Sequence, residues 1–303
     1  MKSVGYDTSA GLGPASASGF EPLTLKAAAG ESMKIPGGSW VLRARFFLKD
    51  LHLVLAGEDG KSVIIRGYYK LDDPPALMTE NGAMISAELA KRLAVPLDPD
   101  PDAAAEPAAR GEPIGHIDTV TGKVQMTHGD GAMEACSNGA PVFKGNVLRT
   151  ESHGTVGVIL ADESAFSLGE KGRLSLDGTA LDPATQAASA TLSLVQGAFT
   201  FVSGPAGEAA SAMVVTTPAA RVGIRGAASG LIVDAEGATT AALMAEKDGS
   251  TNEMIISNPA GAQTINRPSQ AVSVSTFKSP PSKPFAMTME EMCDQFSPYT
   301  FRT

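Results

Sequence analysis

Short runs of alternating apolar and polar residues fill the middle of the chain. Residues 153–226 show the alternation in the segments HGTVGVILADESAFSLGEKGRLSLD, ATLSLVQGAFTFVSG and MVVTTPAARVGIRG. Gly, Asp-Glu or Pro interrupts it every eight to twelve residues or so, which is typical of short antiparallel strands. The same rhythm extends over residues 114–277 without a comparable helix. We therefore predict an all-β domain of stacked antiparallel strands, either a twisted β-solenoid or an elongated sandwich.

Residues 31–95 predict a smaller β unit in front of this domain. The segments SWVLRARFFLKDLHLVL (39–55) and SVIIRGYY (62–69) are strand-like, and Asp59-Gly60 between them is typical of a tight hairpin. One short helix is predicted within residues 85–94, because Ile85, Leu89 and Leu93 are spaced by four. Glu88 and Arg92 are placed to pair on that helix.

Composition divides the rest of the chain. Residues 1–30 are rich in Gly, Ala and Ser and predict a flexible leader, whereas residues 96–113 carry five prolines among alanine and acidic residues and predict a linker. Residues 278–303 begin with a proline-rich spacer. The linker at 96–113 is the clearest predicted domain boundary.

A second short helix is predicted near the C-terminus. Thr288 and Glu291 match a capping box, and Met287 and Met292 are spaced as a hydrophobic staple. One face of this helix would carry Met289, Met292, Cys293 and Phe296. Such a helix either docks on the β domain or serves as a detachable handle for a partner, which makes Met289, Met292 and Phe296 candidate partner-binding residues.

Composition and charge exclude several classes of protein. The 303 residues are long enough for two domains, yet aromatic residues make up only 5% and Gly and Pro number 32 and 20. These proportions suit thin β layers. The net charge of -9 argues against binding to nucleic acids or anionic membranes. No apolar run approaches the length of a membrane span or of a Sec signal peptide, so export would need another signal.

Known catalytic and metal-binding patterns are missing from the residues. The two cysteines, Cys136 and Cys293, form no short pair, and the four histidines show no metal-ligand spacing. Gly60-Lys61-Ser62 lacks the earlier glycine of a phosphate-binding loop, and Asp162-Glu163 suits a turn better than an acid-base pair. No GxSxG motif occurs. We therefore expect a protein without catalytic activity, cofactor or metal.

The run from Thr217 to Gly226 is the most unusual polar feature. Arg221 and Arg225 are four residues apart on a predicted strand, so both guanidinium groups would lie on the same side of it. That side could bind a carboxylate of a partner, or form salt bridges within the chain. Thr217, Arg221 and Arg225 are therefore further candidate partner-binding residues.

Five segments in this order resemble a FecR domain over about residues 114–235: IGHIDTVTGKV, APVFKGNVLRT, GTVGVILADESAFSLG, LSLVQGAFTFVSG and VVTTPAARVGIRG. Two positions depart from the usual pattern. Asp162-Glu163-Ser164 stands where the family commonly has Asp-Gly-Ser, and Ala227 stands where it has threonine.

The N-terminal segments WVLRARFFLKDLHLVLAGEDGKSVIIRGYY and LMTENGAMISAELAKRLA are similar to the head of large bacterial proteins exported by type I secretion. This resemblance implies a surface or secreted module, without a Sec signal, that anchors or scaffolds other envelope proteins; a cytoplasmic location is the alternative. The FecR resemblance implies a second possibility, a regulator that senses an envelope partner. Such a regulator needs a membrane-spanning helix and a sigma-factor-binding part, and the sequence indicates neither. The third possible function is self-association through open strand edges.

Overall fold

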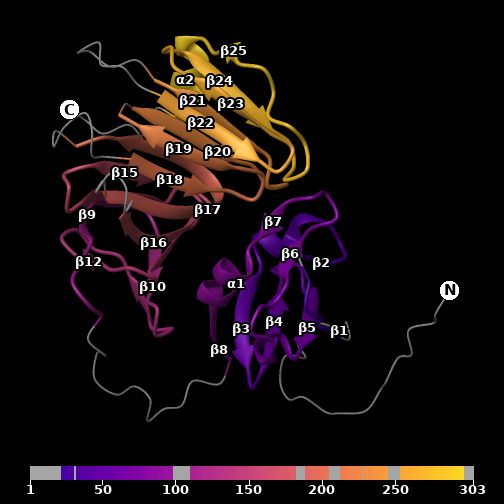
Figure 1. The fold of residues 1–303 in the computed structure, drawn as a ribbon. Helices are drawn as coiled ribbons and strands as arrows, with labels where there is room; N and C mark the ends of the chain where they lie inside the picture. Colours follow the sequence, from indigo (N-terminus) through magenta and orange to yellow (C-terminus); the bar gives the residue numbers. More distant parts are fainter. Residues whose placement is uncertain are drawn as a thin grey trace.

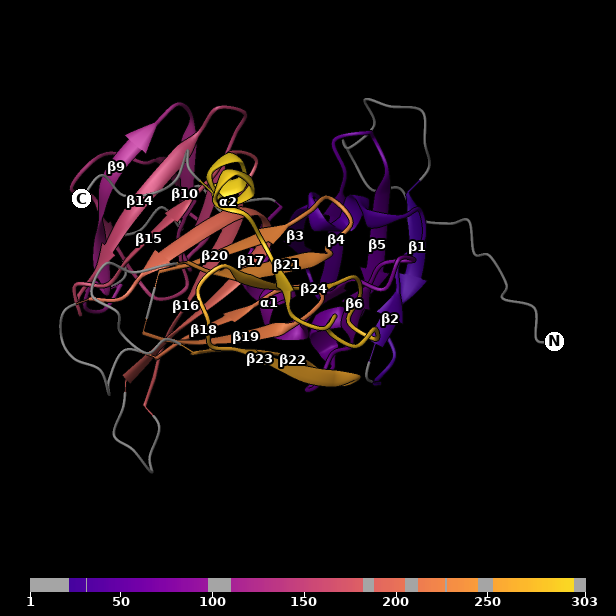
Figure 2. The same ribbon diagram turned by 90° about the horizontal axis from the view of Figure 1, so that it is seen from above.

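The structure, a computed structural model, describes residues 22–30, 32–97, 110–181, 188–204, 212–226, 228–244 and 253–296. Residues 1–21 of the predicted leader and most of the predicted linker lie outside these ranges. The prediction of a flexible leader is wrong for its last part, because Leu23–Lys26 form a strand that pairs with Val63–Arg66. The described residues form a small N-terminal unit (22–97) and a larger β body (110–296), which lie side by side (Figures 1 and 2). The predicted all-β class is confirmed, since strands dominate and the two α-helices are short.

The N-terminal unit contains two small sheets and α1 (Ala87–Leu93). The larger sheet has the order β1 (Leu23–Lys26), β5 (Ser62–Arg66), β4 (His52–Ala56), β3 (Arg45–Lys49) and β8 (Ala94–Pro96). The smaller sheet contains β2 (Ser32–Lys34), β6 (Ala76–Met78) and β7 (Met84–Ile85). The predicted hairpin joins β4 to β5, and Gly60 adopts the positive φ of 82° that its turn requires.

Two details of this unit differ from the prediction. Residues 39–42 form a 3₁₀ helix, η1 (Ser39–Leu42), because Gly37 and Gly38 turn the chain and the four following residues are all buried, which a strand facing one core cannot achieve. Glu88 does not pair with Arg92. Arg92 instead forms an ion pair with Asp177 of the β body, whose carboxylate is only 10% exposed and needs a counter-charge. A second 3₁₀ helix, η2 (Tyr68–Lys70), follows β5.

The β body consists of two layers with a hydrophobic core between them. The first, called here the docking layer, contains β11 (Met133–Ala135), β10 (Val124–Thr127), β13 (Val147–Thr150), β16 (Arg173–Leu181), the first half of β17 (Ala188–Val202), β18 (Ala212–Thr216), β19 (Arg221–Arg225), β22 (Glu253–Asn258) and β23 (Gly261–Ile265). The second, the helix layer, contains β12 (Pro141–Val142), β9 (Gly115–Thr121), β14 (Thr155–Leu160), β15 (Ala165–Leu168), the second half of β17, β20 (Ser229–Val233), β21 (Thr239–Leu243), β24 (Gln270–Val274) and β25 (Phe285–Ala286).

Strand β17 joins the two layers. Its residues up to Gln196 pair with β16, and its residues from Gly197 onward pair with β20. At the crossing, Gly197 has a φ of 105° and lies so close to Gly172 that a Cβ atom would be 2.7 Å from the Gly172 Cα. Two glycines are therefore needed where the strand passes from one layer to the other.

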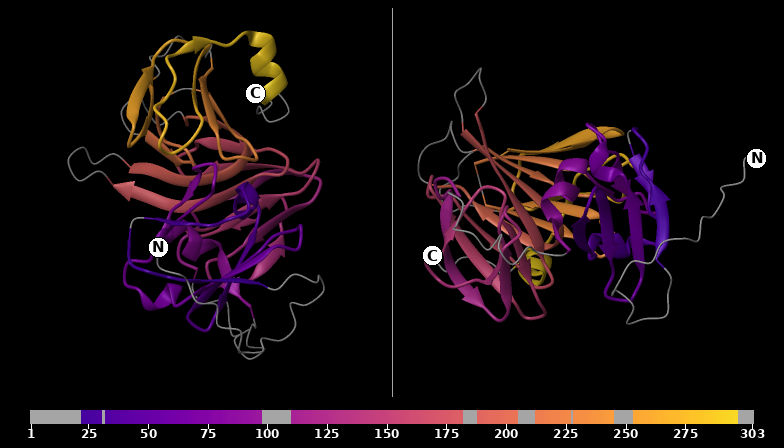
Figure 3. Two further views of the ribbon diagram at one scale, coloured as in Figure 1. Left: turned by 90° about the vertical axis from the view of Figure 1, so that its right-hand side faces the viewer. Right: turned by 90° about the horizontal axis from the view of Figure 1, so that it is seen from below.

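The core follows from the alternation seen in the sequence. In β22, Met254 and Ile256 are fully buried between the layers, while Ile255 points outward and is 39% exposed. Phe166 and Phe199 stack at the centre with ring centroids 5.6 Å apart. The body extends from its first, magenta strands to its last, yellow strands, with the indigo N-terminal unit beside its lower part (Figure 1; Figure 3, left).

The N-terminal unit packs against the outer face of the docking layer. Val147 and Val195 of the body are buried in the same hydrophobic cluster as the core of the unit. The Met84 N–H donates to the Pro218 carbonyl oxygen at 2.9 Å. The unit also reaches the turn between β20 and β21 of the helix layer, where a Cβ atom at Gly237 would lie 2.5 Å from the Ala83 Cβ, so this contact is close-packed.

Helix α2 (Met289–Phe296) covers part of the other face of the body, the outer face of the helix layer (Figures 2 and 3). Its predicted capping box is present. The Thr288 N–H donates to the Glu291 carboxylate at 2.7 Å, and the Glu291 N–H donates to the Thr288 Oγ1 at 3.2 Å. Among the described residues no helix is long and apolar enough to cross a membrane.

Candidate functional site

A groove lies where the N-terminal unit meets the last strands of the docking layer. Its volume is about 370 Å³. The residues around it are Met84, Ser86, Leu89, Thr216, Thr217, Ala220, Arg221, Ser257, Asn258, Pro259 and Phe277. Two of the three candidate residues between Thr217 and Gly226, Thr217 and Arg221, are therefore part of one concave surface.

Thr217 shapes the floor of this groove. Its side chain is buried, and its Oγ1 accepts a hydrogen bond from the Ala220 N–H at 3.0 Å and shares one with the Thr239 hydroxyl at 2.7 Å. The first bond closes the turn from β18 to β19, and the second ties this turn to β21 of the helix layer. Thr217 thus holds the groove in shape and is satisfied within the chain.

Asn258 fixes the opposite wall. Its Nδ2 lies within hydrogen-bond distance of the carbonyl oxygens of Ala219, Thr276 and Ser279, of which Ser279 is nearest at 2.7 Å. This one amide thus ties the end of β22 to two loops that are distant from it in sequence. The sequence reasoning missed it, although the segment Asn-Pro-Ala-Gly marked a turn there.

Arg221 and Arg225 lie on the same outer face of β19, as predicted from their spacing. Both are exposed, while Val222 and Ile224 between them point into the core. Only Arg221 reaches the groove, because four residues of strand span about 13 Å. Within the described part of the chain, no carboxylate is within ion-pair distance of either guanidinium group. Exposed Ile255 lies beside them on β22.

The candidate residues on α2 are placed differently. Met292 and Phe296 are 5% and 1% exposed and pack with Met287 against Ala242 and Ala271 of the helix layer. A partner could contact them only after α2 detached. The Met289 side chain lies outside the described residues.

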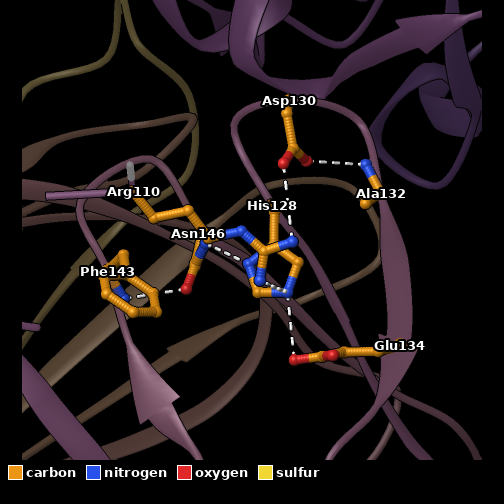
Figure 4. A network of polar contacts seen from close by, with 7 residues as sticks. All are labelled: Arg110, His128, Asp130, Ala132, Glu134, Phe143 and Asn146. Carbon is orange, nitrogen blue, oxygen red and sulfur yellow. Dashed lines mark hydrogen bonds and ion pairs between the residues drawn. The ribbon is translucent and has the colours of Figure 1, made fainter. Parts of the chain in front are cut away.

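His128, one of the four histidines that show no metal-ligand spacing in the sequence, is the centre of a buried polar network (Figure 4). The Asn146 Oδ1 accepts from the Phe143 N–H at 2.8 Å, which leaves the Asn146 NH₂ facing the His128 Nδ1 at 3.0 Å. The His128 Nδ1 must therefore accept a hydrogen bond from this NH₂ group. The proton is then on Nε2, which is 3.0 Å from a Glu134 carboxylate oxygen.

Arg110, at the start of the β body, joins the same network. Its Nη2 lies 3.5 Å from the Asp130 carboxylate, which accepts the hydrogen bond. Its Nη1 lies 3.1 Å from the His128 Nε2, but both nitrogens carry protons in this tautomer, so no hydrogen bond joins them. The Ala132 N–H, and to a lesser extent Arg110, hold the pKa of Asp130 below its usual value. These contacts fasten the chain that enters the body to the β10–β11 hairpin, which is a structural role.

The segments that were compared with catalytic and phosphate-binding motifs have structural roles among the described residues. Ser62 begins strand β5 after Gly60-Lys61, as the sequence predicted, and Lys61 pairs with Asp59 at 2.8 Å. Asp162 accepts from the Ser164 N–H at 3.0 Å within the turn between β14 and β15. Burial, with a contribution from Glu134, raises the pKa of the Cys136 thiol to about 11, which keeps it protonated and a poor nucleophile. No cluster of potential metal ligands occurs within the described ranges.

Comparison with family models finds one match, over part of the chain. The model for the family described as FecR protein matches residues 146–246, about a third of the chain, from the residue before β13 to just beyond β21. Residues 114–145, which the sequence resemblance also included, lie outside this match. No curated protein matches the chain.

Two solved structures are similar to part of the chain. Both are described as "a putative anti-sigma factor from Parabacteroides distasonis ATCC 8503", determined at 1.65 Å and 2.50 Å resolution. Each is 12% identical over 48% of this chain and 61% of its own length, with TM-scores of 0.37 and 0.38. The chain therefore spans less than two thirds of those structures.

Proposed function

We propose that this chain is a non-catalytic protein-binding module, which holds an acidic segment of a partner protein in the groove beside Arg221. The observation that carries the proposal is an exposed arginine that has no ion-pair partner among the described residues, at a concave surface whose other walls are fixed by internal hydrogen bonds. A guanidinium group in such a position can form two parallel hydrogen bonds to a carboxylate.

The surface around the groove suits a short peptide rather than a small polar metabolite. Met84, Leu89 and Phe277 provide apolar lining, and exposed Ile255 extends the apolar area along β22. A segment with one or two acidic residues and an apolar neighbour would satisfy both features.

Regulation of an envelope partner is the biological role that the comparisons favour. The match to the FecR model supports this reading over a purely mechanical scaffold. The finer predictions of a type I-secreted, adhesin-like head and of a cell-surface location rest on the sequence resemblance alone and stay predictions, as does the cytoplasmic alternative.

Self-association through a strand edge is the second candidate. In the larger sheet of the N-terminal unit, β1 pairs with β5 on one side and is the terminal strand on the other, and Leu23 on it is 38% exposed. The edge is short and carries Lys26, which weakens it as a template for pairing.

A selection of random displayed peptides tests the groove directly. The purified chain is the target, and Arg221→Glu is the counter-target that removes groove-independent binders. We expect acidic peptides to be enriched and to lose about 10- to 100-fold in affinity for Arg221→Glu, since a charge-assisted hydrogen bond contributes about 1.5–3 kcal/mol. Fluorescence anisotropy measures the affinities, and light scattering of the same samples reports any self-association.

Arg267→Glu is the matched control, because Arg267 is also an exposed arginine but lies outside the groove. Its peptide affinity should equal that of the wild type. Enrichment of peptides without acidic residues, or equal loss of binding in both variants, would contradict the proposed site.

A further inference from the structure

A second concave site lies between the two units, on the opposite part of their interface from the groove. It is a pocket of about 240 Å³, smaller than the range of about 300–1,000 Å³ typical of drug-sized ligands. Its charged lining residues are Arg43 and Glu58 of the N-terminal unit and Arg149, Glu151, Lys171 and Arg173 of the β body. No sequence motif indicated this site, because its residues come from four separate segments.

Arg149 and Arg173 are direct cross-strand neighbours. They are paired in the register between β13 and β16, and both point outward from the docking layer, because Leu148 and Leu174 beside them are buried in the core. Directly opposed residues on antiparallel strands have Cβ atoms about 4.5–5.5 Å apart, and like charges at that separation are destabilising. The site therefore concentrates positive charge, which an anion would relieve.

Arg173 is held rigidly in the wall of the pocket. One guanidinium nitrogen, Nη1, donates to the Ala44 carbonyl oxygen at 2.7 Å, and the group lies over the Phe46 ring, 5.2 Å from its centroid. No other acceptor for its remaining N–H groups is found among the described residues. Burial first, and Arg149 second, lower the pKa of Arg173 to about 9, so the group is still charged at neutral pH.

The two carboxylates in the lining do not neutralise the site. Glu58 pairs with Arg149 at 2.6 Å, and Glu151 lies 3.9 Å from Lys123, outside the pocket lining. Four cationic groups in the lining face two carboxylates, and the Glu170 carboxylate outside the lining also interacts with Lys171. This still leaves an excess of positive charge, in a chain whose net charge is -9.

We propose that this pocket binds a small oxyanion, the carboxylate or phosphate group of a metabolite, between Arg149 and Arg173. Arg173 provides the fixed donors, and Arg149, Arg43 and Lys171 complete the charge. Because the lining residues come from both units, the bound anion stabilises the docked arrangement of the N-terminal unit on the β body.

Calorimetric titration of the full chain with inorganic phosphate, and separately with succinate, tests the site at constant ionic strength set with chloride. We expect saturable one-to-one binding of at least one of the two anions, and a rise in Tm that saturates over the same concentrations. Tighter binding of phosphate would identify a phosphorylated ligand, and tighter binding of succinate a carboxylate ligand.

Variants distinguish this pocket from general charge attraction. Arg149→Gln and Lys171→Gln should each weaken binding by about tenfold, equivalent to about 1.4 kcal/mol. Arg173→Lys retains the charge but loses the fork of donors, so it should weaken binding as well. Arg267→Gln, an exposed arginine elsewhere, should leave the affinity unchanged.

Two results would overturn the proposal. One is the absence of saturable binding for both anions. The other is an affinity that falls equally in Arg149→Gln, Lys171→Gln and Arg267→Gln, because this would show only the effect of net charge. Lys171 is exposed, so its variant folds even if substitution of Arg173 disturbs the contact with Phe46.

Discussion

The two outer faces of the β body are covered in different ways. The N-terminal unit covers the docking layer with a broad contact that contains both apolar residues, such as Val195, and charged residues, such as the Arg92–Asp177 pair. Helix α2 covers the helix layer with a small apolar contact, in which the Phe296 ring lies where a side chain at Gly230 would be. The N-terminal unit has a hydrophobic core of its own, and grooves and charged pockets form at the margins of its contact with the β body. Helix α2 is only about two turns long and fills a shallow apolar surface.

This difference indicates where each cover could respond to a partner. Removal of the N-terminal unit would expose Val147 and Val195 to water and leave the Asp177 carboxylate without its arginine. The free energy of this removal is therefore comparable to that of opening a hydrophobic core. Release of α2 would expose only a small apolar surface, formed by Ala242 and Ala271 with Ile232 and Met244 packed beside them, and the layers beneath it would remain paired. The helix is therefore the more easily detached element, and the interface of the unit is the more permanent one.

The largest expected effect comes from a charge placed under the N-terminal unit. Val195→Asp introduces a carboxylate at a fully buried position of β17 without a partner, which should lower the free energy of unfolding by about 3–5 kcal/mol. Urea denaturation followed by the fluorescence of Trp40, which lies within the unit, measures the change.

Val202→Asp is its matched control, because Val202 is on the same strand but is 38% exposed on the helix layer. It should cost less than about 1 kcal/mol. Equal losses in the two variants would show that the contact under the unit contributes nothing beyond the strand itself.

The sequence predicted the elements better than their contacts. The alternation of residues identified the strands of the β body, and the capping box at Thr288 identified α2, because both signals are local. The groove, the anion pocket and the Arg92–Asp177 pair could not be predicted, because they join residues that only the layer topology brings together. Arg149 and Arg173, for example, are neighbours only through the register of β13 and β16.

A smaller and local effect is expected at α2. Truncation of a phenylalanine buried in a core lowers the free energy of unfolding by about 3–5 kcal/mol. Phe296→Ala should lose less, because the loss cannot exceed the free energy with which α2 docks on the body, and the helix detaches beyond that point. Hydrogen exchange should rise in residues 287–296 and stay unchanged in β13 to β17. Gln295→Ala, an exposed change on the same helix, is the control. A loss of protection throughout the body would contradict the view that α2 is separable.

The smallest effect concerns the acidic residue of the capping box. Hydrogen bonds from the Thr288 N–H, and then from its hydroxyl, hold the pKa of Glu291 below its usual value of 4.5. A carboxylate with a lowered pKa in the folded state stabilises the helix above its unfolded pKa, and this contribution disappears as the pH falls through the folded value. Protection of residues 287–296, corrected for intrinsic exchange, should therefore decline in acid, and Glu291→Gln should remove the part of this decline below about pH 4.5. Glu290→Gln, its exposed neighbour outside the capping box, should retain the decline, so equal pH profiles for the two variants would show that the capping box does not control the release of α2.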